Sequence, residues 1–226
     1  MGHPLIHLGY SYELNARNVG IEALGLAACF YSDLHKYVDD ASYTKPADYQ
    51  SDDPLKILKK VEHDTHFDGL FDHKGSDNID TLLEKRESEV LNHWNAWQVS
   101  KDPKKQFELA QRAATALVVA THDGSEDYDF FLLHLLTSSH AVRILLPIVP
   151  AKFQVSLVRQ WWLFTLLAYI AQSRPNIDLN RIMSYDTHGK GWKNANQLAL
   201  HGEHCHDAHY VKGQSRGSEP ACPRLT

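Results

Sequence analysis

The sequence predicts an all-α protein: a single domain of several helices, packed in an orthogonal or bundle-like arrangement around one buried central helix. Three observations support this fold class. Apolar residues recur three and four positions apart along most of the chain. Asp-Pro pairs at 53–54 and 102–103 are start signals for helices. No segment alternates apolar and polar residues as a strand would, and no internal repeat or low-complexity linker is present.

The central helix is expected between Ser125 and Pro150. Acidic side chains at its start suit the positive end of a helix dipole, and prolines mark its end. These residues are Glu126, Asp127 and Asp129, then Pro147 and Pro150. The stretch between them is so apolar that other parts of the protein must cover the helix on most sides.

The remaining elements follow in chain order. Helices are expected at residues 4–14, 19–30, 54–63, 78–99, from 103 onward, 153–172, 176–183 and 193–212, the last with a break at Gly202. Residues 31–53 are expected to form a surface connection, and residues 66–78 and 185–192 to form glycine-containing loops. The helical domain is therefore expected to span residues 1–212, and residues 213–226, rich in Gly, Ser and Pro, to form an irregular tail.

The composition excludes several classes of protein. A chain of 226 residues with 43% hydrophobic and 23% charged residues has ample material for one globular core. The net charge of −5 and a pI near 6.3 argue against nucleic-acid binding. The most apolar stretch, residues 161–171, is too short to span a bilayer, so no membrane partner is expected.

The cysteines and the first residues bear on the cell compartment. Cys29, Cys205 and Cys222 are widely spaced and form no CxxC pair, so a disulfide framework is not expected. The first residues have neither the basic start nor the apolar run of a secretory signal. Both observations favour the cytoplasm.

Fifteen histidines are the unusual feature of the composition. The sequence lacks GxGxxG, GxxxxGK[ST], GxSxG and HExxH, so Rossmann-type oxidoreductases and serine hydrolases are disfavoured. Helical proteins build non-haem metal sites from imidazoles on several packed helices. His35, His63, His66, His73 and His93 are assigned to surface or loop positions, and His201, His204 and His206 to a solvated cluster.

His134, in the apolar central helix, has two interpretations. A buried imidazole needs partners for both ring nitrogens, because an unpaired buried polar group is costly. The first interpretation is a core histidine bonded to Thr137, Ser138 or a backbone carbonyl. The second is a metal ligand in a dry pocket. His140 is six residues further on and therefore faces another side of the helix.

Two other helical settings carry candidate ligands. His3 and His7 lie one turn apart near the amino terminus, and His209 and Lys212 lie close together in DAHYVK. His188, in the glycine-containing loop, either lines a pocket or is bonded to Asp186.

Three segments together resemble the fungal questin oxidase-like family. They are HPLIHLGYSYE (3–13), DGSEDYDFFLLHLLTSSHAVR (123–143), and DTHGKGWK with DAHYVK (186–193 and 207–212). The resemblance extends from residue 3 to residue 212. It implies an oxidoreductase that opens the ring of an anthraquinone-type aromatic polyketide with O2, formally a Baeyer–Villiger-like or dioxygenase outcome.

The resemblance also implies a non-haem Fe(II) centre held by histidines and a carboxylated lysine. Matched by motif, the metal ligands are His3, His134, His209 and Lys212, and Lys212 and His188 are the candidate catalytic residues. NADPH is a further cofactor that the resemblance allows. A carbamate forms only on a neutral amine, so burial near a cation should depress the pKa of Lys212. Trp192, Tyr10 and Phe131 are candidate walls for a flat tricyclic substrate.

Members of this family are considerably longer than this chain. The resemblance therefore implies an amino-terminally truncated member that corresponds to the carboxy-terminal part of the family and holds most, but not all, of the metal site. Two alternatives from other classes remain: an inactive helical scaffold or binding protein without metal, and a zinc-dependent hydrolase that uses the same ligands.

Overall fold

The computed structural model describes residues 2–122, 124, 128–208 and 210–211. The chain divides into two compact units, residues 1–179 and residues 180–226. Among the described residues every regular element is helical, and the only extended pairing is an isolated bridge between Ser51 and Trp97. The prediction of an all-α fold is confirmed. The predicted boundary at residue 212 stays a prediction, because the tail lies outside the described residues.

The first unit contains eight α-helices in its described part. They are α1 (Gly2–Glu13), α2 (Arg17–Cys29), α3 (Lys36–Asp39), α4 (Pro54–Glu62), α5 (Asn78–Ala96), α6 (Phe107–Val119), α7 (Phe130–Leu145) and α8 (Ala151–Ala171). Short 3-10 turns lie at Asp33–His35, Ala41–Tyr43 and Thr65–Phe67. In the described part of the second unit, α9 (Asn180–Met183) is joined to α10 (Trp192–His201) by a loop.

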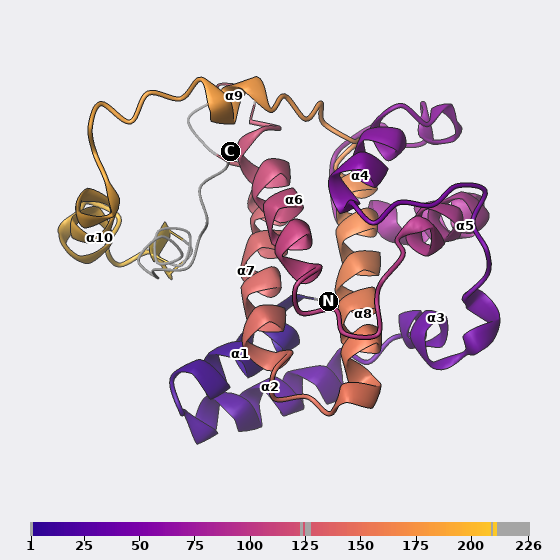
Figure 1. Cartoon of the computed structure of the whole chain (residues 1–226), viewed down its shortest axis with the longest axis horizontal. Helices are drawn as coiled ribbons and strands as arrows, with labels where there is room; N and C mark the ends of the chain where they lie inside the picture. The colour runs from indigo at the N-terminus through magenta and orange to yellow at the C-terminus, as the bar shows by residue number, and fades with distance from the viewer. Residues whose placement is uncertain (1, 123, 125–127, 209, 212–226) are drawn as a thin grey trace. The chain divides into compact units, whose positions relative to one another are not determined.

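The core of the first unit is built around α7 and α8, which lie side by side (Figure 1). All residues from His134 to Val142 in α7 are buried, as are all residues from Trp161 to Ala171 in α8. The prediction of a buried central helix is therefore confirmed, although α8 is buried as deeply as α7. Helix α6 packs mainly against α7 and also contacts α8, and α5 packs against α8 on the side away from α7.

Tryptophans fill the space around α8. Trp97 of the α5 end meets Trp162 edge to face at 5.3 Å, and Phe107 of α6 meets Trp161 in the same way at 5.2 Å. Such edge-to-face pairs add roughly 0.5–1.5 kcal/mol beyond their buried area. The indole N–H of Trp161 donates to Ser138 Oγ (3.1 Å), which fastens α8 to α7.

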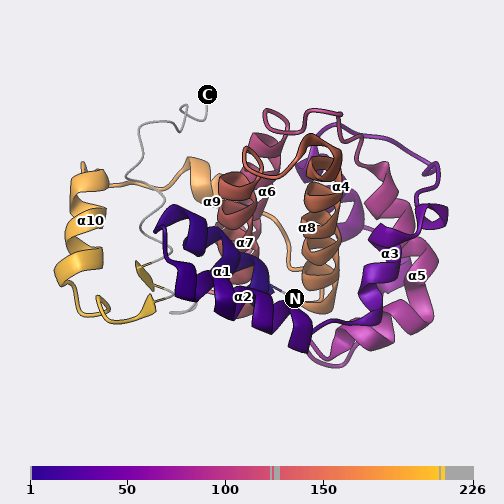
Figure 2. The same ribbon diagram turned by 90° about the horizontal axis from the view of Figure 1, so that it is seen from below.

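Helices α1 and α2 form a hairpin that packs on α7 through α1 (Figure 2). The turn between them places Asn15 at a positive φ of 51°, and the Ser11 hydroxyl donates to the carbonyl of Ala16 (3.0 Å). Of the residues in α2 only Ala23 is buried. The apolar side chains of the helix predicted at residues 19–30 are thus left largely exposed.

The sequence-predicted helix starts agree best with the structure where a side chain caps the helix. Asp53 Oδ1 accepts from the N–H of Leu55 ahead of α4, and Asp129 accepts from the N–H groups of Phe131 and Leu132 ahead of α7. Asp129 is thus the cap of α7, and the two other acids predicted at its start lie outside the described residues.

Several predicted boundaries shift. The surface connection 31–53 contains α3 and two 3-10 turns, and α5 ends at Ala96 with a kink at Arg86 (φ −140°, ψ 30°). Regular helix α6 begins at Phe107 rather than at Pro103, whose carbonyl accepts from the N–H of Phe107 (2.7 Å). Over the residues described, no helix combines the length and the apolar character needed to cross a bilayer.

Candidate metal centre

Helix α1 lies unusually close to α7 at Gly9. A Cβ built on Gly9 would lie 2.5 Å from the Cβ and 2.6 Å from the Cα of Ala141, which no real side chain could tolerate. Only glycine permits this approach. The contact between the two helices extends from His3 and His134 at one end to Glu13 and His140 at the other. The glycine thus sets the distance between the first turn of α1 and His134.

The ring of His134 is held in a defined orientation by its own helix. Its Nδ1 lies 2.8 Å from the carbonyl oxygen of Phe130, one turn earlier. A carbonyl only accepts, so Nδ1 carries the proton, and in a neutral ring Nε2 is the nitrogen that bears the lone pair. A backbone carbonyl on Nδ1 is the usual support for a histidine that binds metal through Nε2. A backbone carbonyl, one of the three partners predicted for a core histidine, is therefore also the support that a metal ligand needs.

His3 faces this lone pair. The two Nε2 atoms are 3.3 Å apart, and the rings meet at 79° with centroids 4.9 Å apart. Imidazole nitrogens bind divalent first-row metals at about 2.1 Å, so two ligands of one ion stand about 3.0–3.4 Å apart for angles between octahedral and tetrahedral. The observed separation fits that requirement. Without an ion, the same distance is a long N–H···N hydrogen bond between the rings.

Burial differs between the two rings. His134 is 7% exposed, whereas His3 is exposed. Phe130 lies edge-on to His134 with centroids 4.9 Å apart and is itself 57% exposed. Phe131, a predicted substrate wall, is half-buried with its ring 6.5 Å from that of His134. The pair therefore has one protected side, toward α7, and one accessible side bordered by aromatic carbon.

The two neighbouring histidines have other partners. His7 Nδ1 lies 3.6 Å from a carboxylate oxygen of Glu22 in α2. His140 Nε2 lies 2.8 Å from Glu13, and its Nδ1 lies 3.1 Å from Arg143. Of the two amino-terminal histidines it is thus His3 that faces His134, and His140 points to a different side of α7, as its spacing predicts.

The other predicted site residues are not brought to this pair by any described contact. His209 and Lys212 lie outside the described residues. His188 belongs to the second unit, where its ring lies 3.1 Å from Asp186 and its backbone N–H also donates to that carboxylate (2.7 Å). His188 is therefore the loop histidine bonded to Asp186 that the sequence allowed. Trp192, in the same unit, is 59% exposed. Tyr10, the third predicted wall, has its ring 5.9 Å from that of His140.

Within the described residues, the candidate metal ligands that lie together are therefore two, His3 and His134. Within residues 2–122, 124, 128–208 and 210–211, no three or more side chains of the His, Cys, Asp and Glu types come together as metal ligands. Two imidazoles alone hold a divalent ion weakly. A complete centre needs further ligands, and the family resemblance implies His209 and Lys212, which lie outside the described residues.

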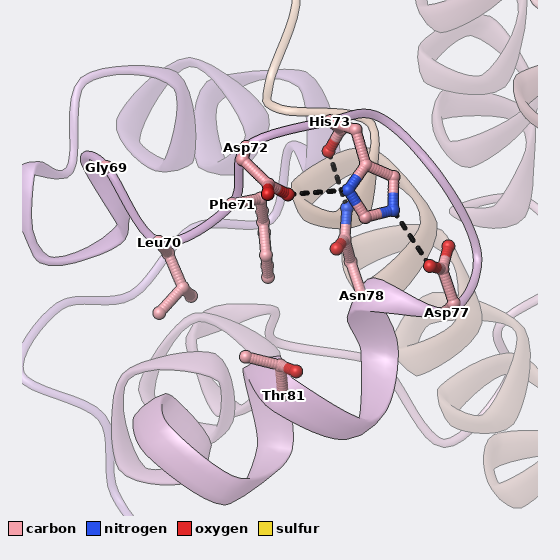
Figure 3. Close-up of a pocket in the computed structure, with 8 residues that line it drawn as sticks. All are labelled: Gly69, Leu70, Phe71, Asp72, His73, Asp77, Asn78 and Thr81. Carbon is pink, nitrogen blue, oxygen red and sulfur yellow. Dashed lines mark hydrogen bonds and ion pairs between the residues drawn. The ribbon is translucent and has the colours of Figure 1, made fainter.

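A separate hollow of about 450 Å³ lies at the start of α5 (Figure 3). Figure 3 shows the ring of His73 between two carboxylates: Nδ1 is 2.6 Å from Asp72, and Nε2 is 2.8 Å from Asp77. These two hydrogen bonds raise the pKa of His73, which favours the imidazolium form. Both ring nitrogens already have carboxylate partners, so this cluster is an ion-pair clamp on the loop.

One histidine was assigned wrongly from the sequence. His93 is not a surface residue: it is 4% exposed, and both of its ring nitrogens are bonded, to Tyr49 and Asp64. The signal that could have found it is its spacing, because His93 stands three residues after the buried Val90 and directly before Trp94. The carboxylate of Glu13, which is bonded to His140, was also missed, because it comes from another helix.

Comparison with known proteins agrees with the resemblance noted in the sequence. No curated protein matches the chain. The family model described as questin oxidase-like matches residues 1–215, which is nearly the whole chain. The residues of this match include the whole of α1 and α7, and with them the His3–His134 pair. The chain belongs to the questin oxidase-like family.

Proposed function

We propose that this chain is an oxidoreductase that uses O2 to open the ring of an anthraquinone-type aromatic polyketide at a non-haem Fe(II) centre. Membership of the questin oxidase-like family supports the oxidase class. The metal, the ligands and the substrate are the parts that are proposed. NADPH as a second cofactor, and the cytoplasm as the compartment, remain expectations of the sequence.

The observation that carries the proposal is the 3.3 Å separation between Nε2 of His3 and Nε2 of His134. Neutral imidazole is a suitable ligand for Fe(II), and the spacing of the two nitrogens matches neighbouring positions around one ion. Bound there, Fe(II) would supply the redox chemistry with O2 that opening an aromatic ring requires. His209 and Lys212 are the proposed further ligands.

The chain itself fixes the geometry in advance. The Phe130 carbonyl holds the proton of His134 on Nδ1 and directs its Nε2 toward His3. The capping carboxylate of Asp129 in turn fixes the first turn of α7, which contains Phe130. Such outer partners hold ligands in place before a metal arrives and typically change metal affinity by about 10–100-fold.

Substrate access is proposed on the exposed side of the pair. His3 is exposed, and the exposed ring of Phe130 lies against His134. A flat polycyclic substrate would stack against such a ring while its polar edge faced the imidazoles. The roles proposed for these residues are therefore binding and orientation: the imidazoles hold the ion, and the phenylalanine positions the substrate.

The test is the iron content and O2 consumption of the purified full chain with an anthraquinone substrate. His3→Ala should lose both bound iron and substrate-dependent O2 uptake. Because His3 is exposed, this change should cost little stability. His7→Ala is the matched control, since it lies on the same helix one turn later and faces Glu22, and it should keep both.

Two outcomes would contradict the proposal. Stoichiometric zinc without O2 uptake would favour the hydrolase alternative. Folded protein that binds neither iron nor zinc would favour the scaffold alternative.

A further inference from the structure

A second constellation of titratable groups lies between α4, α5 and the segment before α4. Tyr49 Oη is 2.6 Å from Nδ1 of His93, and Nε2 of His93 is 2.8 Å from Asp64 Oδ2. Asp64 is also bonded through its other oxygen to the ring and the backbone N–H of His66. The three side chains thus form one continuous hydrogen-bonded chain with a buried imidazole in the middle.

The protonation state of this chain follows from its acceptors. Burial alone would raise the pKa of Asp64, but hydrogen bonds from His66 and His93 outweigh it and hold the pKa below its ordinary value. An ionised carboxylate only accepts, so His93 carries its proton on Nε2. Its Nδ1 is then a lone pair, and the Tyr49 hydroxyl must donate to it. In this state the Tyr49 oxygen can only accept from any further group.

The lowered pKa of His93 favours its neutral form. Burial lowers its pKa, the hydrogen bond and charge of Asp64 partly offset this, and the positive charges of Lys60 and His66 add to the lowering. If His93 gains a proton, Nδ1–H becomes a donor to Tyr49, and the Tyr49 hydroxyl is released to donate elsewhere. The direction of the Tyr49 hydroxyl therefore follows the charge on His93.

An open pocket of about 500 Å³ adjoins this chain. It is lined by Tyr49, Lys59, Lys60, His63, Asp64 and His93. Lys59 is already paired with Glu62 at 2.9 Å. Lys60 Nζ lies 4.8 Å from the centre of the Tyr49 ring and, over the residues described, has no carboxylate within ion-pair distance. The pocket thus presents a cation without an anionic partner next to a hydroxyl group.

We propose that this pocket binds a small oxyanion between the Lys60 ammonium group and the Tyr49 hydroxyl, with uptake of one proton from solvent by His93. The proton balance is complete. One solvent proton goes to His93 Nδ1, the Tyr49 proton turns from His93 to the anion, and Asp64 stays ionised and compensates the imidazolium. The ligand class is a tetrahedral oxyanion such as a phosphate group, or a carboxylate.

Other charged and titratable groups surround the pocket. Lys59 is neutralised by its partner Glu62, and Asp64 supplies the negative charge beside His93. His63 also lines the pocket, and the ring of His66 is bonded to Asp64. His93 adds its charge only at lower pH in the free protein. A bound anion should raise its pKa, because binding and protonation are thermodynamically linked and therefore reciprocal.

The test follows the His93 ring resonances of the full chain by NMR. Sodium sulfate and sodium acetate are the two probes, because neither changes charge between about pH 5.5 and pH 8. Sodium chloride at matched ionic strength is the reference. Tighter binding of sulfate would identify tetrahedral oxyanions as the ligand class, and tighter binding of acetate would identify carboxylates. The expected result is a raised pKa of His93 and affinity about tenfold tighter at the acidic end of the range.

Two variants and one control variant locate the effect. Lys60→Met should abolish binding, whereas Lys56→Met, another exposed lysine of α4 outside the pocket, should leave it unchanged. Tyr49→Phe keeps the ring beneath Lys60 but should weaken binding and flatten its pH dependence. The unfolding midpoint of each variant shows that it is folded. A His93 pKa unmoved by both probes, or equal binding by the Lys60 and Lys56 variants, would overturn the proposal.

Discussion

Gly9 of α1 and Ala141 of α7 are in contact so close that the missing Cβ of the glycine would overlap the alanine (2.5 Å). Seven residues before Ala141 on the same stripe stands His134, and at the start of α1 stands His3. The two imidazoles face each other because the helices touch at this glycine. The candidate metal centre therefore depends on a residue that carries no chemistry of its own.

Gly9→Ala should destabilise the protein and separate the two histidines. Alanine normally stabilises a helix interior by roughly 0.5–1 kcal/mol relative to glycine. Here the overlap with Ala141 should reverse the sign and cost about 1–3 kcal/mol net. Urea denaturation measures the change in the free energy of unfolding.

Gly25→Ala is the matched control for this substitution. Gly25 lies in α2, and a Cβ built there meets nothing within 4 Å, so alanine should be neutral or stabilising. Adding Ala141→Gly to Gly9→Ala should restore only part of the loss, because the Ala141 Cα is itself 2.6 Å from the new Cβ. Equal effects of the two glycine substitutions would show that the close contact is not limiting.

Asp129→Ala should weaken both the fold and the metal site. The Asp129 carboxylate accepts from two N–H groups of the first turn of α7, so its loss should cost about 1 kcal/mol. The frayed turn contains Phe130, whose carbonyl orients His134. Metal affinity, measured by competition with a chelator, should therefore fall by about tenfold. Asp53→Ala removes the comparable cap of α4 and should cost similar stability without the loss of affinity.

Arg174→Met should destabilise the first unit by more than the loss of one charged side chain usually does. Its Nη1 donates to the carbonyls of Val61, Glu62 and Asp64, and its Nη2 pairs with Asp68 at 2.7 Å. The side chain is 10% exposed, so its loss should leave carbonyls at the end of α4 unsatisfied and cost about 2 kcal/mol.

Arg112→Met tests whether any arginine would behave in this way. Arg112 is exposed on α6, so its substitution should change the free energy of unfolding by less than about 0.5 kcal/mol. Arg174→Lys should reduce the stability nearly as much as Arg174→Met, because a single ammonium group cannot reproduce the planar fork of donors. Thermal unfolding of the three variants side by side separates these cases.

His73 should titrate above the ordinary histidine pKa of 6.5, because Asp72 and Asp77 both stabilise its imidazolium form. A raised pKa in the folded state contributes stability that is fully present below pH 6.5 and is lost as the pH rises through the folded value. NMR titration of the ring measures it. Asp77→Asn should move the pKa of His73 back toward 6.5. A wild-type value at or below 6.5 would contradict the ion-pair clamp.

The sequence predicted the structure correctly where the signal lies within a single helix or turn. Asp53-Pro54 marks the first residues of α4 because the cap and the proline act within one turn. The apolar runs of α7 and α8 identify the core because helices without a polar face must be covered. His134 was singled out for the same reason: it is a polar side chain in an apolar helix.

The features that the sequence did not predict depend on contacts between segments that are far apart in the chain. The kink of α5 at Arg86 accompanies a hydrogen bond from its side chain to the carbonyl of His66, and no local signal announces it. The burial of His93 depends on Tyr49 and Asp64, which lie far away in the sequence. Likewise, spacing alone could not decide whether His3 or His7 meets α7, since that choice is made by the Gly9–Ala141 contact.

The most direct test of the central claim is anomalous X-ray diffraction from crystals of the full chain grown with Fe(II). The account predicts an iron peak about 2.1 Å from both His3 Nε2 and His134 Nε2, with the bond from His134 Nδ1 to the Phe130 carbonyl intact. The result that would contradict it is the two rings hydrogen-bonded to each other without iron between them, while iron is absent or bound at other residues.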